Sequence, residues 1–234
     1  MPSFRNRSYQ PELLDRPDIP FDDIRRNMDE LDFINTWLGG HAITVAGLKK
    51  MLRGVAGDHL VICEIGCGGG NNLRAVDRWL QKKKIRASYI GIDINPHCIE
   101  HAKATARLGN AEWITADYKA VQFDVKPHII FTSLFCHHFT DDELTFMVRW
   151  MRDNTRMGFF INDLHRHPLA FHSIRLLTRL FSRSYLVKND APLSVLRGFS
   201  RKELSTLMQR PGLLNCSIEW RWAFRWLVVA KKAS

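Results

Sequence analysis

The sequence predicts an α/β fold, doubly wound around a mainly parallel seven-stranded sheet, with a C-terminal antiparallel hairpin. Three observations predict it. Short apolar runs alternate with amphipathic segments through about residues 57–164. The first apolar run, residues 61–65, passes directly into a glycine-rich turn and then into an amphipathic segment. Two apolar runs at the C-terminus are too close together for a crossover helix, so they must pair antiparallel.

The glycine-rich turn has the pattern E-x-G-x-G-x-G, formed by Glu64, Gly66, Gly68 and Gly70. Because glycine has no Cβ, the main chain at such a turn can approach a nucleotide-like ligand closely. The dinucleotide fingerprint G-x-G-x-x-G would need glycine where Asn71 stands, and no G-x-x-x-x-G-K-[ST] phosphate loop occurs. The turn therefore disfavours a dehydrogenase. Taken alone, it is also compatible with a purely structural strand-to-helix connection.

The next two predicted strands both end on acidic residues. Residues 87–92 predict a strand that ends at Asp93, and Asn95 with Pro96 supplies the cap and first residue of a helix that reaches about residue 108. Residues 111–116 predict a third strand, which ends at Asp117. An acid after the second strand of such a unit can accept hydrogen bonds from both hydroxyls of a ribose.

With these three loops, residues 57–231 resemble the class I S-adenosylmethionine (SAM) dependent methyltransferases, whose first motif is this glycine pattern. The resemblance implies SAM as cofactor and S-adenosylhomocysteine (SAH) as product. It implies that Asp93 binds the ribose and that Asp117 accepts a hydrogen bond from the adenine amino group. The residues expected at the cofactor are Glu64, Gly66, Cys67, Gly68, Gly70, Asn71, Asp93, Ile94, Asp117, Tyr118, Ser133 and His137.

The remaining elements complete a predicted domain over residues 57–234. In order, we expect a strand at 127–133, a helix from the capping box of Thr140 and Glu143 to about 154, a strand at 157–162, a helix at 168–182, a loop at 186–198, a helix capped by Ser200 with Glu203, and strands at 213–220 and 223–231. The final hairpin matches the resembled family, whereas dehydrogenase halves usually lack it. Residues 164–200 would form an insertion on the substrate side.

Residues 1–56 predict an N-terminal helical extension that acts as a lid. Its first twenty residues are polar and contain several prolines, so we expect them to lie on the surface. A helix begins at Phe21, shows one apolar stripe and ends at Gly39 and Gly40, and a second helix covers about 43–52. Trp37, just before the glycine pair, could stack on a flat ligand or pack on the core.

Composition indicates a soluble globular protein. The chain has 234 residues, 45% hydrophobic residues and a formal net charge of +10, with no apolar run long enough to cross a membrane and no signal-peptide core, so we expect a cytoplasmic protein. Its five cysteines show no paired spacing, which disfavours a structural zinc site or a disulfide framework. The charge alone would allow nucleic-acid binding.

Histidines follow two neighbouring predicted strands and are the candidate catalytic residues. His137 and His138 follow the fourth strand, and Asp163, His165 and His167 follow the fifth. A neutral imidazole suits proton removal near neutral pH. We therefore expect His165 or His138 to deprotonate a hydroxyl, with His167 as a further candidate, while Asp163 orients an imidazole or binds substrate.

Each of these histidines could also have a structural role. The pair after the fourth strand could cap the next helix, and the other two could bond backbone groups. Four histidines also resemble metal ligands, but no carboxylate spacing completes a recognisable site, so we expect no metal.

The acceptor is expected to be a small molecule. The fourth strand is not followed by Asp/Asn-Pro-Pro-aromatic, the tetrapeptide with which many family members clamp a planar nitrogen, so methylation of nucleic acid is disfavoured. The chain looks like the O-methyltransferases of phenolic, polyketide, lipid or quinone-like compounds. An RNA methyltransferase and a non-catalytic SAM-binding protein are the alternatives.

The predicted helix at 169–183 is basic and amphipathic. Arg175, Arg179 and Arg183 share one face, and leucines with Phe181 cover the other. Such a helix could contact an anionic membrane or an acyl-bearing substrate, or could be a lid helix with solvated arginines.

Overall fold

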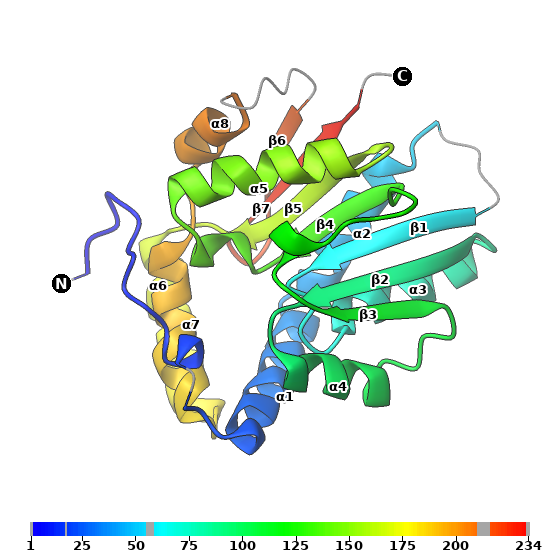
Figure 1. The fold of residues 1–234 in the computed structure, drawn as a ribbon. Helices are drawn as coiled ribbons and strands as arrows, with labels where there is room; N and C mark the ends of the chain where they lie inside the picture. The colour runs from blue at the N-terminus through cyan, green and yellow to red at the C-terminus, as the bar shows by residue number, and fades with distance from the viewer. Residues whose placement is uncertain (1, 17, 55–58, 210–215, 233–234) are drawn as a thin grey trace.

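A computed structural model describes residues 2–16, 18–54, 59–209 and 216–232, and its centre is one seven-stranded sheet (Figure 1). The strand order is β3-β2-β1-β4-β5-β7-β6. The strands are β1 (His59–Ile65), β2 (Arg86–Asp93), β3 (Ala111–Thr115), β4 (Ile129–Ser133), β5 (Gly158–Leu164), β6 (Cys216–Arg221) and β7 (Arg225–Lys231). The first five are parallel, whereas β7 pairs antiparallel with both β5 and β6. The predicted fold class is therefore confirmed, including the C-terminal hairpin.

Eight α-helices and three short 3-10 turns surround the sheet in the described residues. The helices are α1 (Phe21–Trp37), α2 (Gly40–Met51), α3 (Asn71–Lys82), α4 (Pro96–Thr105), α5 (Asp141–Asn154), α6 (Pro168–Phe181), α7 (Tyr185–Arg197) and α8 (Arg201–Gln209). The turns are η1 (Leu13–Asp15), η2 (Tyr118–Ala120) and η3 (Cys136–His138). None of the described helices is both long and apolar enough to span a bilayer.

The two faces of the sheet carry separate cores because alternate strand residues point to opposite sides. One face packs against α5 and α8, for example through Met147 and Leu204. The other packs against α2 and α3, for example through Leu48 and Leu73, while Phe131 and Phe160 stack 4.9 Å apart beneath α2. The N-terminal helix α2 is thus part of the helical layer that covers the sheet, in contact with β5 and β7.

The carboxyl ends of the parallel strands face a second group of elements. The helices α6 and α7 pack against each other, and α7 also contacts α1, η1, η3 and β5. Figure 1 shows this helix pair, α1 and the N-terminal segment lying across the ends at which β1, β2 and β4 terminate. Side chains from distant parts of the sequence can therefore meet at this edge of the sheet.

Most predicted boundaries agree with the structure to within a few residues, but the loop expected at 186–198 is wrong. These residues belong to α7, which contains Pro192 in its interior. Ser184 caps the helix by accepting a hydrogen bond from the Val187 N–H at 3.3 Å. A proline inside a helix costs about 3 kcal/mol, and burial of large apolar side chains such as Leu186 and Leu193, at about 1.5–3 kcal/mol each, offsets that cost.

Two other boundaries differ. The helix α4 ends at Thr105 rather than near residue 108, because Arg107 adopts a left-handed backbone with φ of 52°. The predicted strand at 213–220 begins at Cys216 in the structure, and residues 213–215 lie outside the described part of the chain.

Candidate active site

The glycine turn after β1 has left-handed backbone at three positions. The φ angles of Gly66, Gly68 and Gly70 are 67°, 50° and 75°. A Cβ on Gly66 would lie 2.3 Å from the Phe135 ring, and one on Gly70 would lie 2.4 Å from Trp113. A Cβ on Gly68 would meet no atom within 4 Å. The first and third glycines thus admit neighbouring rings, whereas the second presents bare main chain to open space, where a ligand can approach.

Asp93 joins the turn after β1 to the turn after β2. Its Oδ2 accepts a hydrogen bond from the Gly68 N–H at 2.8 Å, and its Oδ1 accepts one from the Asn95 N–H at 2.9 Å. Burial raises the pKa of Asp93, although these backbone N–H groups act in the opposite direction. Each carboxylate oxygen keeps a second lone pair, which can accept a hydroxyl. Ile94 beside it is 71% exposed.

In the loop after β3, Asp117 is exposed to solvent and Tyr118 is buried in the core. Asp117 is exposed and caps η2 by accepting a hydrogen bond from the Lys119 N–H at 3.0 Å. The Tyr118 ring instead enters the core and makes edge contacts with Phe139 and Trp150, and its hydroxyl finds no hydrogen-bond partner among the described residues. Asp117 is therefore available to a ligand, and Tyr118 supports the loop from below.

Glu64 takes part in a buried polar network beneath α2. Its Oε1 accepts a hydrogen bond from Asn72 Nδ2 at 3.0 Å, and burial raises the pKa of this carboxyl well above its usual value. Asn72 also bonds His41 and Thr44 on α2. The Oε2 atom of Glu64 is buried without a partner among the described residues.

Asn162 extends the same network at the end of β5. Its Nδ2 lies 3.1 Å from both Gly40 O and Thr44 Oγ1 and 3.2 Å from Ser133 Oγ, while its Oδ1 is buried without a partner in the described chain. Glu64 Oε2 and Asn162 Oδ1 thus have no partner in the described chain and lie on β1 and β5, the two strands that flank β4. A ligand donor such as an ammonium group could complete either oxygen.

The other residues predicted in the first loop have simpler positions. Asn71 is the first residue of α3, where backbone N–H groups are free of partners in their own helix. Cys67 is buried, and burial raises the pKa of its thiol well above the usual value, so it stays protonated at neutral pH. Its Sγ would lie 3.0 Å from a Cβ on Gly91, which indicates a space-filling role.

The structure brings His137 and Asp163 into direct contact. His137 Nδ1 lies 2.8 Å from Asp163 Oδ1, and both side chains are buried. Asp163 also accepts hydrogen bonds from the N–H groups of Phe135, His137 and Leu164. Burial alone would raise the pKa of Asp163, but these interactions outweigh it and hold the pKa below its usual value. Because the carboxyl is ionised, it accepts a hydrogen bond from Nδ1 of His137, and Nε2 is the ring nitrogen directed away from Asp163.

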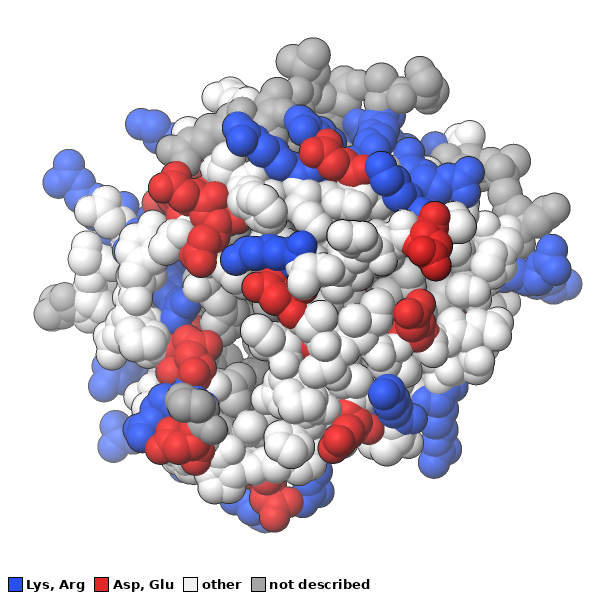
Figure 2. All heavy atoms as spheres, in the orientation of Figure 1, with Lys and Arg blue, Asp and Glu red and all other residues white. Residues whose placement is uncertain are grey.

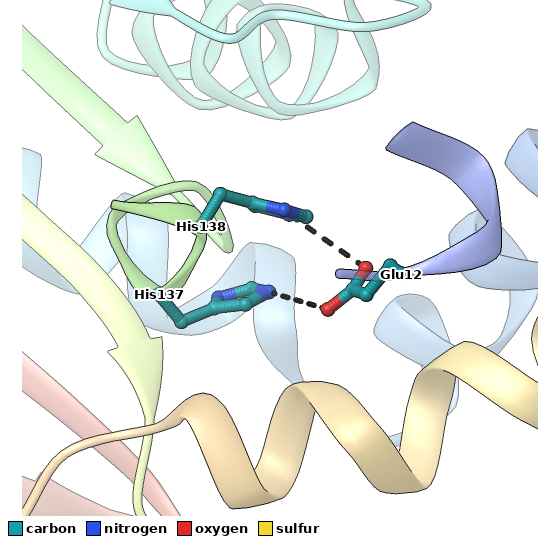
Figure 3. Close-up of side chains that lie close together, drawn as sticks. All are labelled: Glu12, His137 and His138. Atoms are coloured by element: carbon teal, nitrogen blue, oxygen red, sulfur yellow. Dashed lines mark ion pairs between the residues drawn. The ribbon is translucent and has the colours of Figure 1, made fainter. Parts of the chain in front are cut away.

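Glu12 of the N-terminal segment faces both histidines (Figure 3). Its Oε1 lies 3.7 Å from His137 Nε2, and its Oε2 lies 3.9 Å from His138 Nε2. The two imidazoles are 4.3 Å apart, and Asp15 approaches His138 Nδ1 to 3.5 Å. Burial raises the pKa of Glu12, while His138, Ser194 and Arg197 act to lower it. We call Glu12, His137 and His138 the His–Glu cluster.

Two buried arginines hold this cluster in place. Arg197 of α7 donates hydrogen bonds to the carbonyls of His137 and His138 at 3.2 and 2.9 Å. Arg7 donates to the carbonyl of Phe139 at 2.9 Å and forms an ion pair with Asp141 at 2.8 Å. The N-terminal segment, η3 and α7 are therefore fixed to one another by charge-assisted hydrogen bonds.

His165 and His167 form a separate group at the turn between β6 and β7. The His165 ring packs 4.9 Å from Trp226, and its Nδ1 is buried without a partner among the described residues. His167 stacks on Phe224 at 5.0 Å and caps α6, because its Nδ1 accepts a hydrogen bond from the Leu169 N–H at 3.2 Å. Burial lowers the pKa of His165. The structure therefore gives His167 a capping role, and Asp163 contacts His137 instead of either ring.

Sequence reasoning missed Glu12, Asp15 and Arg197. The two acids lie in a stretch that was expected only to run over the surface, and the arginine lies in the segment expected to be a loop. Asn162 carried a stronger signal, because an amide inside an otherwise apolar strand end must find partners when it is buried. No local pattern connects Glu12 to a histidine pair 125 residues away in the chain.

An apolar groove lies between α1 and α6. It has a volume of about 440 Å³ and is lined by Phe33, Trp37, Leu177 and Phe181, among others, with Arg183 at its side. Trp37 is 74% exposed and Phe181 is 78% exposed. Trp37 therefore does not pack into the core, and the apolar face predicted for the 169–183 helix is open.

The molecular surface is hollowed on the side of the strand ends. Figure 2 shows this hollow in the region where Figure 1 places the carboxyl ends of the strands opposite α6 and α7. Acidic and basic side chains are interspersed around it, with acids at its edge. On the face drawn there, Lys and Arg side chains gather along the upper part, away from the hollow.

Comparison with known proteins agrees with this architecture. Residues 62–158 match a family model described as "Methyltransferase domain". This stretch is less than half of the chain and is similar to methyltransferase domains, and the mainly parallel sheet with its C-terminal hairpin is the methyltransferase fold. No curated protein sequence matches the chain.

Solved structures share the fold of this methyltransferase domain at low sequence identity. The plantazolicin methyltransferase BpumL, solved with SAH, is 15% identical, with a TM-score of 0.67 over 94% of this chain and 92% of its own. Human N-acetylserotonin methyltransferase, solved with SAM, is 14% identical, with a TM-score of 0.62 over 91% of this chain and 57% of its own. A putative O-methyltransferase from Nostoc punctiforme is 13% identical, with a TM-score of 0.60 over 87% of this chain and 59% of its own.

Proposed function

We propose that this protein transfers the methyl group of SAM to a hydroxyl group of a small organic molecule. The observation that carries the proposal is a spatial one. The bare main chain at Gly68, the acid Asp93 and the His–Glu cluster all lie at the carboxyl ends of β1, β2 and β4. One edge of the sheet thus offers both a nucleotide-type site and groups that can take up a proton.

The residues at this edge fit the parts of SAM. Asp93 has free lone pairs for ribose hydroxyls, and exposed Asp117 can accept the adenine amino group. The unpartnered acceptors Glu64 Oε2 and Asn162 Oδ1 suit the ammonium group of the methionine portion. When bound, SAM supplies an activated methyl carbon, whose bond to sulfur breaks with the electron pair returning to sulfur as the acceptor oxygen attacks.

The His–Glu cluster is the place where the acceptor hydroxyl loses its proton. Asp163 fixes the His137 tautomer so that Nε2 presents a lone pair toward Glu12. His138 is partly exposed, so the cluster is accessible from the side of that ring. Burial of Glu12 and His137 excludes water, which favours transfer to the bound acceptor over loss to solvent.

The acceptor is a small, largely apolar molecule of the phenolic, polyketide, lipid or quinone-like class. The N-terminal segment and α7 enclose the cluster, which leaves no room there for a folded macromolecule. The 440 Å³ apolar groove between α1 and α6 has the size and lining of a small-molecule site. Two structural neighbours are described with small aromatic or azole ligands, apigenin and desmethylPZN analogues. The interspersed charges in Figure 2 do not favour the RNA alternative.

Calorimetry and a methylation screen test this proposal. We expect SAH to bind the purified protein with one-to-one stoichiometry, and NADH not to bind. Radiolabelled SAM should then label members of a panel of phenols and hydroxylated quinones, and His137→Ala should abolish labelling. Absence of SAH binding would refute the proposal, and labelling only of amines would refute its hydroxyl acceptor. The same proposal includes two further parts: the arginine face of α6 contacts an anionic membrane or an acyl-bearing substrate, and residues 1–56 act as a lid. Sedimentation with anionic vesicles tests the membrane contact.

A further inference from the structure

The three side chains of the His–Glu cluster converge without touching. One ligand atom from each of Glu12, His137 and His138 lies within 4.8 Å of the other two. The nitrogen-to-oxygen distances of 3.7 and 3.9 Å are longer than a hydrogen bond, which needs about 2.7–3.2 Å. Figure 3 shows both imidazole rings directed at the two oxygens of one carboxylate. The gap between these atoms has room for one shared partner.

Each imidazole is oriented by a second carboxylate. Asp163 Oδ1 lies 2.8 Å from His137 Nδ1, and Asp15 Oδ1 lies 3.5 Å from His138 Nδ1. With Nδ1 of each ring next to one of these carboxylates, Nε2 of each ring is directed into the gap toward Glu12. A carboxylate behind each histidine is the arrangement that orients histidine ligands of metal ions.

The charge around the gap suits a divalent cation. Glu12, Asp15 and Asp163 contribute three negative charges, and Arg197 lies 4.0 Å from Glu12 Oε1 and contributes one positive charge. Arg7 is neutralised by its ion pair with Asp141. Asp190, which caps η1 through the N–H groups of Leu13 and Leu14, adds a further negative charge nearby. Among the described residues, Glu12 is a buried carboxylate with Arg197 at 4.0 Å and a hydrogen bond from Ser194 Oγ at 2.7 Å, and a bound cation would add to this stabilisation.

We propose that Glu12, His137 and His138 bind one divalent transition-metal ion of the zinc class, to which the acceptor hydroxyl coordinates. This inference rests on the proposed O-methyl transfer and names the group that activates the hydroxyl there. Two imidazole nitrogens and one carboxylate are a ligand set for zinc or ferrous iron with open positions, whereas magnesium prefers oxygen ligands alone. Ligand distances of about 2.0–2.2 Å would place such an ion within the gap.

The metal ion would take the role that a general base has in a metal-free site. A hydroxyl bound to a divalent cation loses its proton at a lower pH, and because both Nε2 atoms would bind the ion, the proton would leave to solvent on the side of the partly exposed His138. The resulting oxygen anion is the nucleophile for the methyl carbon, and the electron pair of the methyl–sulfur bond goes to sulfur. The carbonyl contacts of Arg197 keep both ligand histidines at fixed positions while the acceptor enters.

Titration of the whole protein with metal ions tests the inference directly. The protein is first treated with a chelator and dialysed, and is then titrated calorimetrically with Zn²⁺ and spectroscopically with Co²⁺. We expect one equivalent of each ion to bind, with visible Co²⁺ absorption bands typical of nitrogen and oxygen ligands. Glu12→Gln and His138→Ala should each weaken binding at least about a hundredfold, and Asp15→Asn roughly ten- to a hundredfold. His59→Ala, an exposed histidine at the amino end of β1, should bind both ions as the wild type does.

The outcomes separate this inference from the proposed function. If the metal-free protein binds neither ion stoichiometrically, or if Glu12→Gln and His138→Ala bind as tightly as His59→Ala does, the metal site is refuted. The wild-type titration decides the question even if a variant misfolds, which circular dichroism will show. Full methylation of a phenol in the presence of chelator would refute the role of the metal while leaving hydroxyl transfer and His137 as its base. Failure of SAH to bind would refute the proposed function, whatever the metal titration shows.

Discussion

Alanine substitutions at three glycines test whether Gly68 faces the cofactor. The other two positions, Gly54 and Gly66, serve as comparisons. The φ angles of Gly54, Gly66 and Gly68 are 77°, 67° and 50°. Alanine in this left-handed region costs about 1–2 kcal/mol at each position. A Cβ at Gly54 or Gly68 meets no atom within 4 Å, whereas a Cβ at Gly66 lies 2.3 Å from the Phe135 ring. Gly54, near the amino end of β1, is therefore the matched control for Gly68.

The backbone cost sets the expected stability changes. In Gly54→Ala and Gly68→Ala, about 1–2 kcal/mol corresponds to a Tm decrease of roughly 2–8 °C for a chain of this size. Gly66→Ala should add an overpacking cost of about 1–3 kcal/mol and lower the Tm further. Only Gly68→Ala places its methyl group against the bound cofactor, so SAH binding should weaken by about 1–3 kcal/mol, or roughly five- to a hundredfold in Kd.

Differential scanning fluorimetry gives the Tm values, and isothermal titration calorimetry gives the Kd for SAH at a temperature where all variants are folded. Equal SAH affinity in Gly68→Ala and Gly54→Ala would refute the inference that the open side of the turn receives the cofactor. A Gly66→Ala variant as stable as Gly68→Ala would show that the Phe135 ring moves aside easily.

Three further predictions concern the supports of the site. Asp163→Asn should lower the free energy of unfolding by about 3–5 kcal/mol in urea titrations, because it breaks a buried charge pair. Because the pKa of Asp163 is lowered in the folded protein, its contribution to the free energy of unfolding is complete above the usual pKa of 3.8 and is lost as the pH falls through the lower folded value. The variant and the wild type should therefore converge in stability in strong acid. A stability difference that stays constant with pH would contradict this. Arg197→Lys should lower the free energy of unfolding by about 1–3 kcal/mol, because it removes hydrogen bonds to the carbonyls of His137 and His138. Arg175→Lys, on the exposed face of α6, should change it by no more than about 0.5 kcal/mol. Equal Tm values for the two variants would contradict a stabilising role of the Arg197 hydrogen bonds. Thr140→Ala should lower the free energy of unfolding by about 1 kcal/mol by removing the capping box of α5. The control is Thr145→Ala in the same helix, where a half-buried hydroxyl donates only to the Asp141 carbonyl, and a Tm equal to that of the control would argue against the cap.

The sheet and most of its helices could be predicted because their signals are local. Apolar runs ending at Asp93 and Asp117, the cap at Asn95 and the capping box at Thr140 each occupy a few consecutive residues. The structure places all of these elements within a few residues of the prediction. The exception is α7, where Pro192 is tolerated only because tertiary burial of its neighbours offsets the local cost.

The site was harder to predict because its partners are distant in the sequence. The glycine turn and the histidine pair could be recognised as candidates, but not which ring Asp163 contacts, since that depends on how β4 and β5 align at Ser133 and Asn162. Glu12 lies in a segment without apolar periodicity, so only tertiary structure reveals its position opposite His138. The cofactor assignments and the choice of base stay predictions for the experiments above.

The attachment of residues 7–15 to η3 and α7 has a consequence for how the protein is made. On the ribosome these residues emerge well before their partners at positions 137–141 and 190–197. The side chains of Arg7 and Glu12, which are buried in the folded protein, must therefore remain hydrated until those partners have left the exit tunnel. Assembly of this corner is thus a late, long-range step of folding, and a bulky tag fused ahead of Arg7 would act on that step.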